Sequence, residues 1–205
     1  SFGSPHATAR AVFRGKPEGA DGMNSSFIHS GPEMYSWAVT SIYGTDIYDC
    51  GTSSEPCIRT YEYNSNTAPV IIWDTDFVRT GGIELKTAGT NTAAKSQTWI
   101  LRRVRTFDTL NTARSIHFST PPAVAAGGTR EVTSCFFDRG INQATLGQFE
   151  ITNTVFAGNF YSHGIDIVPS PFYWNKFENN LVHNTKAHAS GSTTWGNIKD
   201  AFFIQ

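Results

Sequence analysis

Charged side chains are scarce in this sequence. Aspartate, glutamate, lysine and arginine make up only 16% of the 205 residues, although a soluble globular domain usually has about a quarter. Serine, threonine, asparagine and glycine are plentiful instead, which favours a β-rich protein that is extracellular or at the cell surface. The net charge of −1 gives no electrostatic basis for binding nucleic acid, so no nucleic-acid partner is expected.

Long apolar runs and helical periodicity are also missing. No run of about 18 apolar residues occurs, so no membrane insertion is predicted. Apolar residues at a 3.6-residue period persist for no more than one turn, which excludes substantial helices. The chain is long enough for one domain with a real core. We expect a single domain over residues 1–205, irregular in 1–69 and clearly repetitive in 70–205, either whole or a portion of a longer repeat protein.

The cysteines are few and odd in number. Cys50 and Cys57 flank a turn-forming segment that is short enough to close as a disulfide loop. A secreted origin favours this bridge, whereas a reducing compartment would leave two thiols. No histidine lies near the pair, so it is a poor zinc signal. Cys135 is left over, either as a lone thiol or as a thiol that bridges two chains.

Short strands recur along the chain and can be aligned on a phenylalanine. The aligned residues lie 30, 30, 19 and 21 positions apart: Phe77, Phe107, Phe137, Phe156 and Phe177. Five positions before them stand Ile72, Arg102, Val132, Ile151 and Phe172, of which four are apolar. A second short strand follows in three repeats, at 83–85, 116–118 and 165–167.

This spacing predicts an all-β solenoid. One supersecondary unit every 20–30 residues or so cannot bury its own apolar face, and the units must therefore stack. Strands of successive units would pair in parallel, giving about eight short rungs. The alternative is an antiparallel sandwich, which also has short strands and glycine-rich turns. The repeats from residue 70 onward contain no Asn-Gly or Asp-Gly hairpin dipeptide, which favours the solenoid.

The repeat that includes Ile151, Asn153 and Phe156 carries a family resemblance. It reads apolar-x-Asn-x-x-Phe-x-Gly-Asn and is followed by Gly-Ile-x-Ile at 164–167. This pattern resembles the right-handed parallel β-helix of pectate-lyase-like proteins, over about residues 70–185. The resemblance implies a right-handed parallel β-helix. It leaves function open, because that superfamily contains polysaccharide lyases, glycoside hydrolases, tailspikes, adhesins and cell-surface proteins.

Two outward columns follow from the phenylalanine alignment. The residues four before each phenylalanine are expected outside: Trp73, Arg103, Thr133, Thr152 and Tyr173. The residues two before are expected outside as well: Thr75, Arg105, Cys135, Thr154 and Asn175. Aromatic faces stack on sugars and arginines bind carboxylates, so Trp73, Arg103, Arg105 and Tyr173 are candidate glycan-binding residues. Alternatively, Trp73 packs under a loop and the arginines pair with Asp74, Asp76 or Asp108.

A third outward column belongs to the second strands. In-register stacking would place Glu84 beside His117, with Asp166 further along. A carboxylate that orients an imidazole suits general-base chemistry. These three residues are the candidate catalytic groups if the chain is an enzyme, and the resemblance implies a lyase that removes a proton from a uronic acid. Lyases of this superfamily often use calcium, but Asp74 and Asp76 form no convincing cluster, so no metal or other cofactor is predicted.

Two functions remain open from the sequence. The first is an extracellular structural or surface solenoid that assembles with copies of itself or within a larger surface assembly, with glycan contacts. The second is a polysaccharide lyase or glycoside hydrolase acting on an acidic polysaccharide. The expected partners are therefore further copies of the chain, a polysaccharide, or both.

Overall fold

The computed structural model describes part of the chain. The described residues are 9–15, 28–29, 41–62, 70–87, 98–110, 115–119, 129–139, 141–144, 148–157, 166–167, 176–182 and 203–204. They form strands and turns with no helix among them, which confirms the all-β class for this part of the chain. None of these residues accordingly belongs to a helix long and apolar enough to cross a membrane.

The strands form two main sheets and one small pair. The ten-stranded sheet contains β1 (Ala11–Arg14), β3 (Ser41–Cys50), β5 (Val70–Thr80), β7 (Trp99–Phe107), β9 (Thr129–Thr133), β10 (Phe136–Phe137), β12 (Gln148–Thr152), β13 (Val155–Phe156), β15 (Lys176–Glu178) and β16 (Leu181–Val182). The five-stranded sheet contains β2 (Ile28–His29), β4 (Ile58–Glu62), β6 (Ile83–Thr87), β8 (Ile116–Ser119) and β11 (Ile141–Ala144). β14 (Asp166–Ile167) pairs with β17 (Phe203–Ile204).

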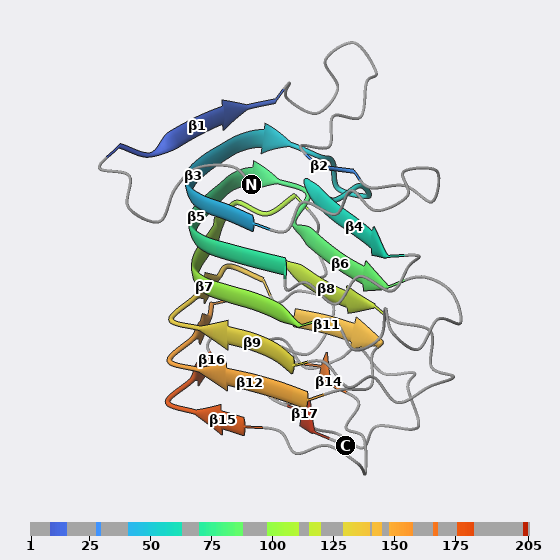
Figure 1. Ribbon diagram of the computed structural model, residues 1–205, viewed down its shortest axis with the longest axis vertical. Helices are drawn as coiled ribbons and strands as arrows, with labels where there is room; N and C mark the ends of the chain where they lie inside the picture. The colour runs from blue at the N-terminus through green and yellow to red at the C-terminus, as the bar shows by residue number, and fades with distance from the viewer. Residues whose placement is uncertain are drawn as a thin grey trace.

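Every described pairing between strands is parallel. The chain alternates between the sheets: β3, β5 and β7 lie one below another in the larger sheet, while β4, β6 and β8 stack in the smaller one (Figure 1). Runs of β-branched and aromatic residues such as 70–73 favour these strands. Parallel pairing excludes the antiparallel sandwich for this part of the chain. Each strand of a sheet pairs with the equivalent strand one repeat later in the chain. We call the strands of one repeat a layer.

The strands of the larger sheet bend at one equivalent residue in each layer. That residue has a positive φ, between 51° and 56°, in six successive layers: Gly44, Asp74, Arg103, Ser134, Asn153 and Asn179. The pairing registers on both sides of the bend align these six positions. Asparagine, aspartate and glycine tolerate this left-handed conformation better than other residues, which explains much of the composition at the bend.

The bend changes the in–out alternation that the sequence predicts. In β5, Ile72 and Phe77 are buried, as expected. Between them the bend at Asp74 shifts the alternation by one residue, so that Thr75 is fully buried. For the same reason Asn153 is exposed and Thr154 is buried, whereas the phenylalanine alignment predicts Thr154 outside.

The phenylalanine alignment is also one residue out of register in β7. Phe77 pairs with Thr106, and Val78 pairs with Phe107. Thr106 is therefore the buried residue at the position aligned with Phe77, and Phe107 points outward, where its ring stacks on Phe136 with centroids 5.4 Å apart. By the same shift the inward residue before the bend is Leu101 rather than Arg102.

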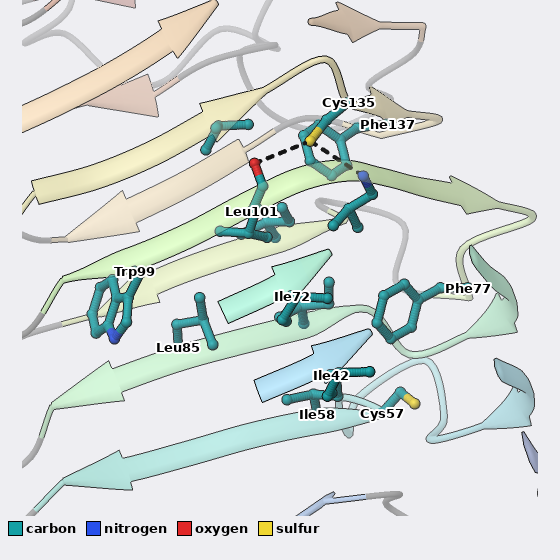
Figure 2. Packing of buried hydrophobic residues seen from close by; sticks show 14 of the residues in the cluster. Ile42, Cys57, Ile58, Ile72, Phe77, Leu85, Trp99, Leu101, Cys135 and Phe137 are labelled. Atoms are coloured by element: carbon teal, nitrogen blue, oxygen red, sulfur yellow. Dashed lines mark hydrogen bonds between the residues drawn. The ribbon is translucent and has the colours of Figure 1, made fainter. Parts of the chain in front are cut away.

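The core lies between the two main sheets. Both contribute to one buried cluster, for example Ile72 and Leu101 from the larger sheet and Ile58 and Leu85 from the smaller (Figure 2). At one end of this interior the Arg130 guanidinium lies 4.7 Å from the ring of Trp99, and both residues are fully buried. Such a cation–π contact offsets part of the cost of burying the charge.

Candidate functional site

The smaller sheet places three ionisable side chains in one register column. Arg59 in β4 pairs with Glu84 in β6, and Glu84 pairs with His117 in β8. Directly paired positions of parallel strands are about 4.8 Å apart, so these side chains must meet on the face of the sheet. We call Arg59, Glu84 and His117 the charged triad. The predicted proximity of Glu84 and His117 is thus present in the structure, and Arg59 is a member that the sequence analysis missed.

Glu84 is the centre of the triad. Its Oε2 atom accepts a hydrogen bond from Nε of Arg59 at 2.6 Å, and its Oε1 atom lies 3.3 Å from Nδ1 of His117, a polar contact without the geometry of a hydrogen bond. The contact with His117, then the hydrogen bond and charge of Arg59, lower the pKa of Glu84 to about 2 against the opposing effect of burial. Glu84 is therefore a carboxylate acceptor rather than a proton donor at neutral pH.

A small pocket opens beside the triad. It has a volume of about 50 Å³ and is lined by the triad together with Ser54, Pro56, Gly81, Ile83 and Ser115. The loop that contains Ser54 and Pro56 packs so closely on Gly81 that a Cβ atom there would lie 1.9 Å from the Glu55 carbonyl oxygen. Arg59 also binds Glu55 of this loop at 2.7 Å. The loop therefore closes over the triad and leaves room for water or a small ion.

Asp166 does not lie on a strand of the sheet that contains the triad. It belongs to β14, which pairs with β17, whereas the sheet of the triad ends at β11, where Asn142 pairs with His117. Of the three candidate catalytic residues, the structure thus brings together Glu84 and His117 only.

A second candidate site lies on the outer face of the larger sheet. Trp73 is half-buried, and the guanidinium carbons of Arg102 and Arg103 lie 5.6 and 5.4 Å from its ring centroid. The ring of Tyr43, from the preceding layer, is 6.4 Å away. We call Tyr43, Trp73, Arg102 and Arg103 the aromatic–arginine patch. Arg102 pairs directly with Trp73, and Arg103 reaches the ring from the bend.

The arginines of this face are engaged with carboxylates. Arg105 binds Asp76 through two hydrogen bonds of 2.6 and 2.8 Å, and Arg102 binds Glu131 at 2.6 Å. Arg103 is the least engaged: its side chain is 59% exposed and lies 4.0 Å from Asp74. Arg105 therefore pairs with an aspartate, which was the alternative to glycan binding. Arg103 is the arginine that is best placed to bind an external anion. Tyr173 and Asn175 lie outside the described residues.

The cysteines differ from the sequence expectation. Cys50, Cys57 and Cys135 are all free and buried, and Cys50 Sγ lies 3.9 Å from the carbonyl oxygen of Cys57. The predicted disulfide is therefore absent from the structure. Cys135 occupies the inward position after the bend and is 3% exposed, which leaves its sulfur out of reach of another chain. The pattern placed it outside because the shift at Ser134 was not foreseen.

A further polar cluster was not foreseen either. The carboxylate of Asp138 accepts hydrogen bonds from both hydroxyl and backbone N–H of Thr109, at 2.6 and 2.7 Å, and from the hydroxyls of Thr106 and Ser115 at 2.6 and 3.0 Å. The Asp138 carboxylate, which follows β10, thus connects the turn after β7 with the residue that precedes β8. These donors satisfy the carboxylate, which indicates a structural role. Within the described ranges, no three histidine, cysteine, aspartate or glutamate side chains group as a metal site.

Comparison with known proteins identifies no relative of this chain. Protein-family models, curated proteins and solved structures gave no match to this chain. Function is therefore inferred from the charged triad, the aromatic–arginine patch and the strand ladder.

Proposed function

We propose that this chain is a parallel β-solenoid of the pectate-lyase-like kind that serves as a structural protein of an extracellular or cell-surface assembly. The observation that carries the proposal is the regularity of the ladder. All described pairings are parallel, and the bend recurs at the equivalent residue in six successive layers. Such a repeat extends by adding layers, including layers from another molecule. Support for an extracellular location comes from the low charge content and the polar β-rich surface.

The charge distribution supports a scaffold. Charged side chains on the larger sheet are mostly bound to opposite charges on neighbouring strands: Arg10 to Asp46 at 2.6 Å, Arg79 to Asp49 at 2.7 Å and Arg105 to Asp76 at 2.6 Å. These pairs join successive layers and leave few cations for a substrate among the described residues of this sheet. Side chains engaged in this way stabilise the stack rather than a transition state.

Self-association is the direct test of this function. Sedimentation velocity over a wide concentration range should show particles heavier than the 22.5 kDa monomer, with the heavier fraction growing with concentration. A single monomeric species at every concentration would argue against self-assembly.

Glycan contact is the second part of the proposal, located at the aromatic–arginine patch. An aromatic ring flanked by guanidinium groups can stack on a sugar and bind an acidic substituent. Trp73→Ala should weaken binding to an immobilised uronate polymer at least about tenfold, the loss expected for one stacked aromatic. Phe107→Ala is the matched control, because Phe107 is an exposed aromatic residue of the same sheet outside the patch. Equal losses in both variants would remove the patch from the proposal.

A polysaccharide lyase or glycoside hydrolase is the second candidate, favoured by the contact between Glu84 and His117. In this function His117 would act as the base and Glu84 would orient it. The pocket of about 50 Å³ is too small for a sugar ring, which is why the enzyme ranks second. Lysis of uronate polymers that appears as ultraviolet absorbance of the unsaturated product, and that His117→Ala abolishes, would reverse this ranking.

A further inference from the structure

The two ends of the ten-stranded sheet carry matching apolar side chains. Val12 on β1 is 66% exposed and Leu181 on β16 is 57% exposed, the two highest values among large hydrophobic residues in the described chain. Within that part of the chain β1 pairs only with β3, and β16 pairs only with β13. Both exposed residues therefore lie on strands that have a described partner on one side only, and an edge without a partner is the part of a sheet that pairs most readily with another chain.

Val12 and Leu181 occupy the same register column. The pairings run from Val12 through Asp46, Asp76, Arg105, Phe136 and Val155 to Leu181. At the next register position, Phe13 aligns with Ile47 at one end, and Val182 aligns with Phe156 at the other. Phe13 is only partly buried against the core. Side chains of one kind thus stand at equivalent positions of the first and the last described layers.

We infer that copies of this chain associate head to tail, with β16 of one copy adding in parallel to the edge of β1 that lies opposite β3 in the next. The inference deepens the proposed function and rests on it. In this pairing Leu181 lies directly over Val12 of the next copy, and Val182 lies over its Phe13. Each column then continues across the junction with the spacing of about 4.8 Å that it has within the chain.

A second copy fits these ends better than another partner does. One register brings apolar residues together at both neighbouring positions, and the parallel direction of the internal ladder is kept. Proteins usually protect edge strands with charges or proline. Here β1 has a single charged residue, Arg14, which is bound over the ring of Tyr48 at 4.8 Å, and β16 has none. The charges at this end of the sheet lie in β15, where Lys176 and Glu178 bind each other at 3.2 Å. The contact is heterologous, so that repetition gives rods or fibres unless a rotation closes a ring.

Complementary variants test this inference. Val12→Asp or Leu181→Asp alone should weaken self-association about tenfold, because every junction then sets a carboxylate against an apolar residue in place of the valine–leucine contact. An equal mixture of the two variants should form dimers and stop there, since one intact Leu181 can meet one intact Val12. Phe107→Asp is the matched control, an exposed apolar residue away from both ends, and it should associate like the wild type.

Each result bears on a different claim. If the wild type is monomeric throughout, both the proposed assembly and this inference fail. If the wild type associates but Leu181→Asp associates equally well, the assembly stands and the head-to-tail junction is wrong; failure of the mixture to dimerise has the same meaning. Should an aspartate variant not fold, Val12→Cys mixed with Leu181→Cys replaces it. Oxidation should then give covalent dimers between the two variants, and their absence would overturn the junction.

Discussion

The buried thiol of Cys135 belongs to a column of hydroxyl groups. Thr45, Thr75 and Thr154 stand at the equivalent position after the bend, and each hydroxyl donates to the carbonyl two residues earlier, at 2.9 to 3.1 Å. Cys135 Sγ makes the same contact at 3.3 Å. The sulfur also accepts from the Val104 N–H at 3.4 Å, as the Thr154 hydroxyl accepts from the Cys135 N–H at 3.3 Å. Side chains thus satisfy backbone groups that the bend turns away from the strand ladder.

The cysteines should be unreactive in the folded protein. Burial raises the pKa of the Cys135 thiol to about 12, and only a thiolate attacks disulfide reagents at a useful rate. A chromogenic disulfide reagent at pH 8 should therefore find almost no thiol in native protein and three after unfolding in urea, since Cys50, Cys57 and Cys135 are all free. A single thiol in urea would instead indicate the Cys50–Cys57 bridge.

The charged triad should make stability depend on pH in the acid range. The folded-state pKa of Glu84 is lowered to about 2 from its usual 4.5, so its contribution is complete above pH 4.5 and is lost as the pH falls toward 2. The free energy of unfolding should fall by about 1 to 3 kcal/mol from this group between pH 5 and pH 2. In Glu84→Gln this part of the pH dependence should disappear. Glu178→Gln, at an exposed site, is the control and should keep the wild-type slope.

At the scale of elements, the recurring bend controls which residues face the core. Ser134 occupies it between β9 and β10 with a φ of 56°, where a side chain with a Cβ atom is strained. Ser134→Gly should therefore raise the free energy of unfolding by about 0.5 to 1 kcal/mol, and Ser134→Val should lower it by about 1 to 2 kcal/mol. Urea denaturation measures both changes.

The neighbouring residue provides a matched control for the bend. Thr133 lies in β9 with its hydroxyl 3.0 Å from that of Thr152, and Thr133→Gly should destabilise by about 1 kcal/mol. A glycine substitution is thus expected to raise the free energy of unfolding at position 134 and to lower it at position 133. Equal destabilisation at 133 and 134 would show that the left-handed conformation is not what limits the choice of residue at the bend.

The repeat pattern predicted the parts of the fold that depend on apolar spacing. Ile72, Val132 and Ile151 are buried as expected, and Glu84 and His117 meet because strands 83–85 and 116–118 are in register. The pattern could not locate the bend, because positive φ occurs there at Arg103 and Ser134 as well as at asparagine. Nor could it find Arg59, because the layer that precedes its strand has Ile47 in place of the aligned phenylalanine.

At the scale of the whole molecule, stability should vary along the stack. The inner strands β5 and β7 have partners on both sides, whereas β1 and β16 have one described partner each (Figure 1). Amide hydrogens of an edge strand are released by opening one strand, and those of an inner strand only by disrupting the stack. Hydrogen exchange in dilute protein should therefore be slowest in β5 and β7 and fastest in β1 and β16.

Concentration should change this gradient in a defined way. If copies stack head to tail, the strands at the junction become inner strands of a longer ladder, and mass action favours the protected form at high concentration. Exchange in β1 and β16 should then slow as the protein is concentrated, while exchange in β5 and β7 stays the same. Leu181→Asp should remove the concentration dependence from both ends at once, because each junction needs one β16 and one β1. Protection that grows evenly over all strands would instead indicate association through a face of the sheets, and protection at β1 alone would indicate pairing between like ends.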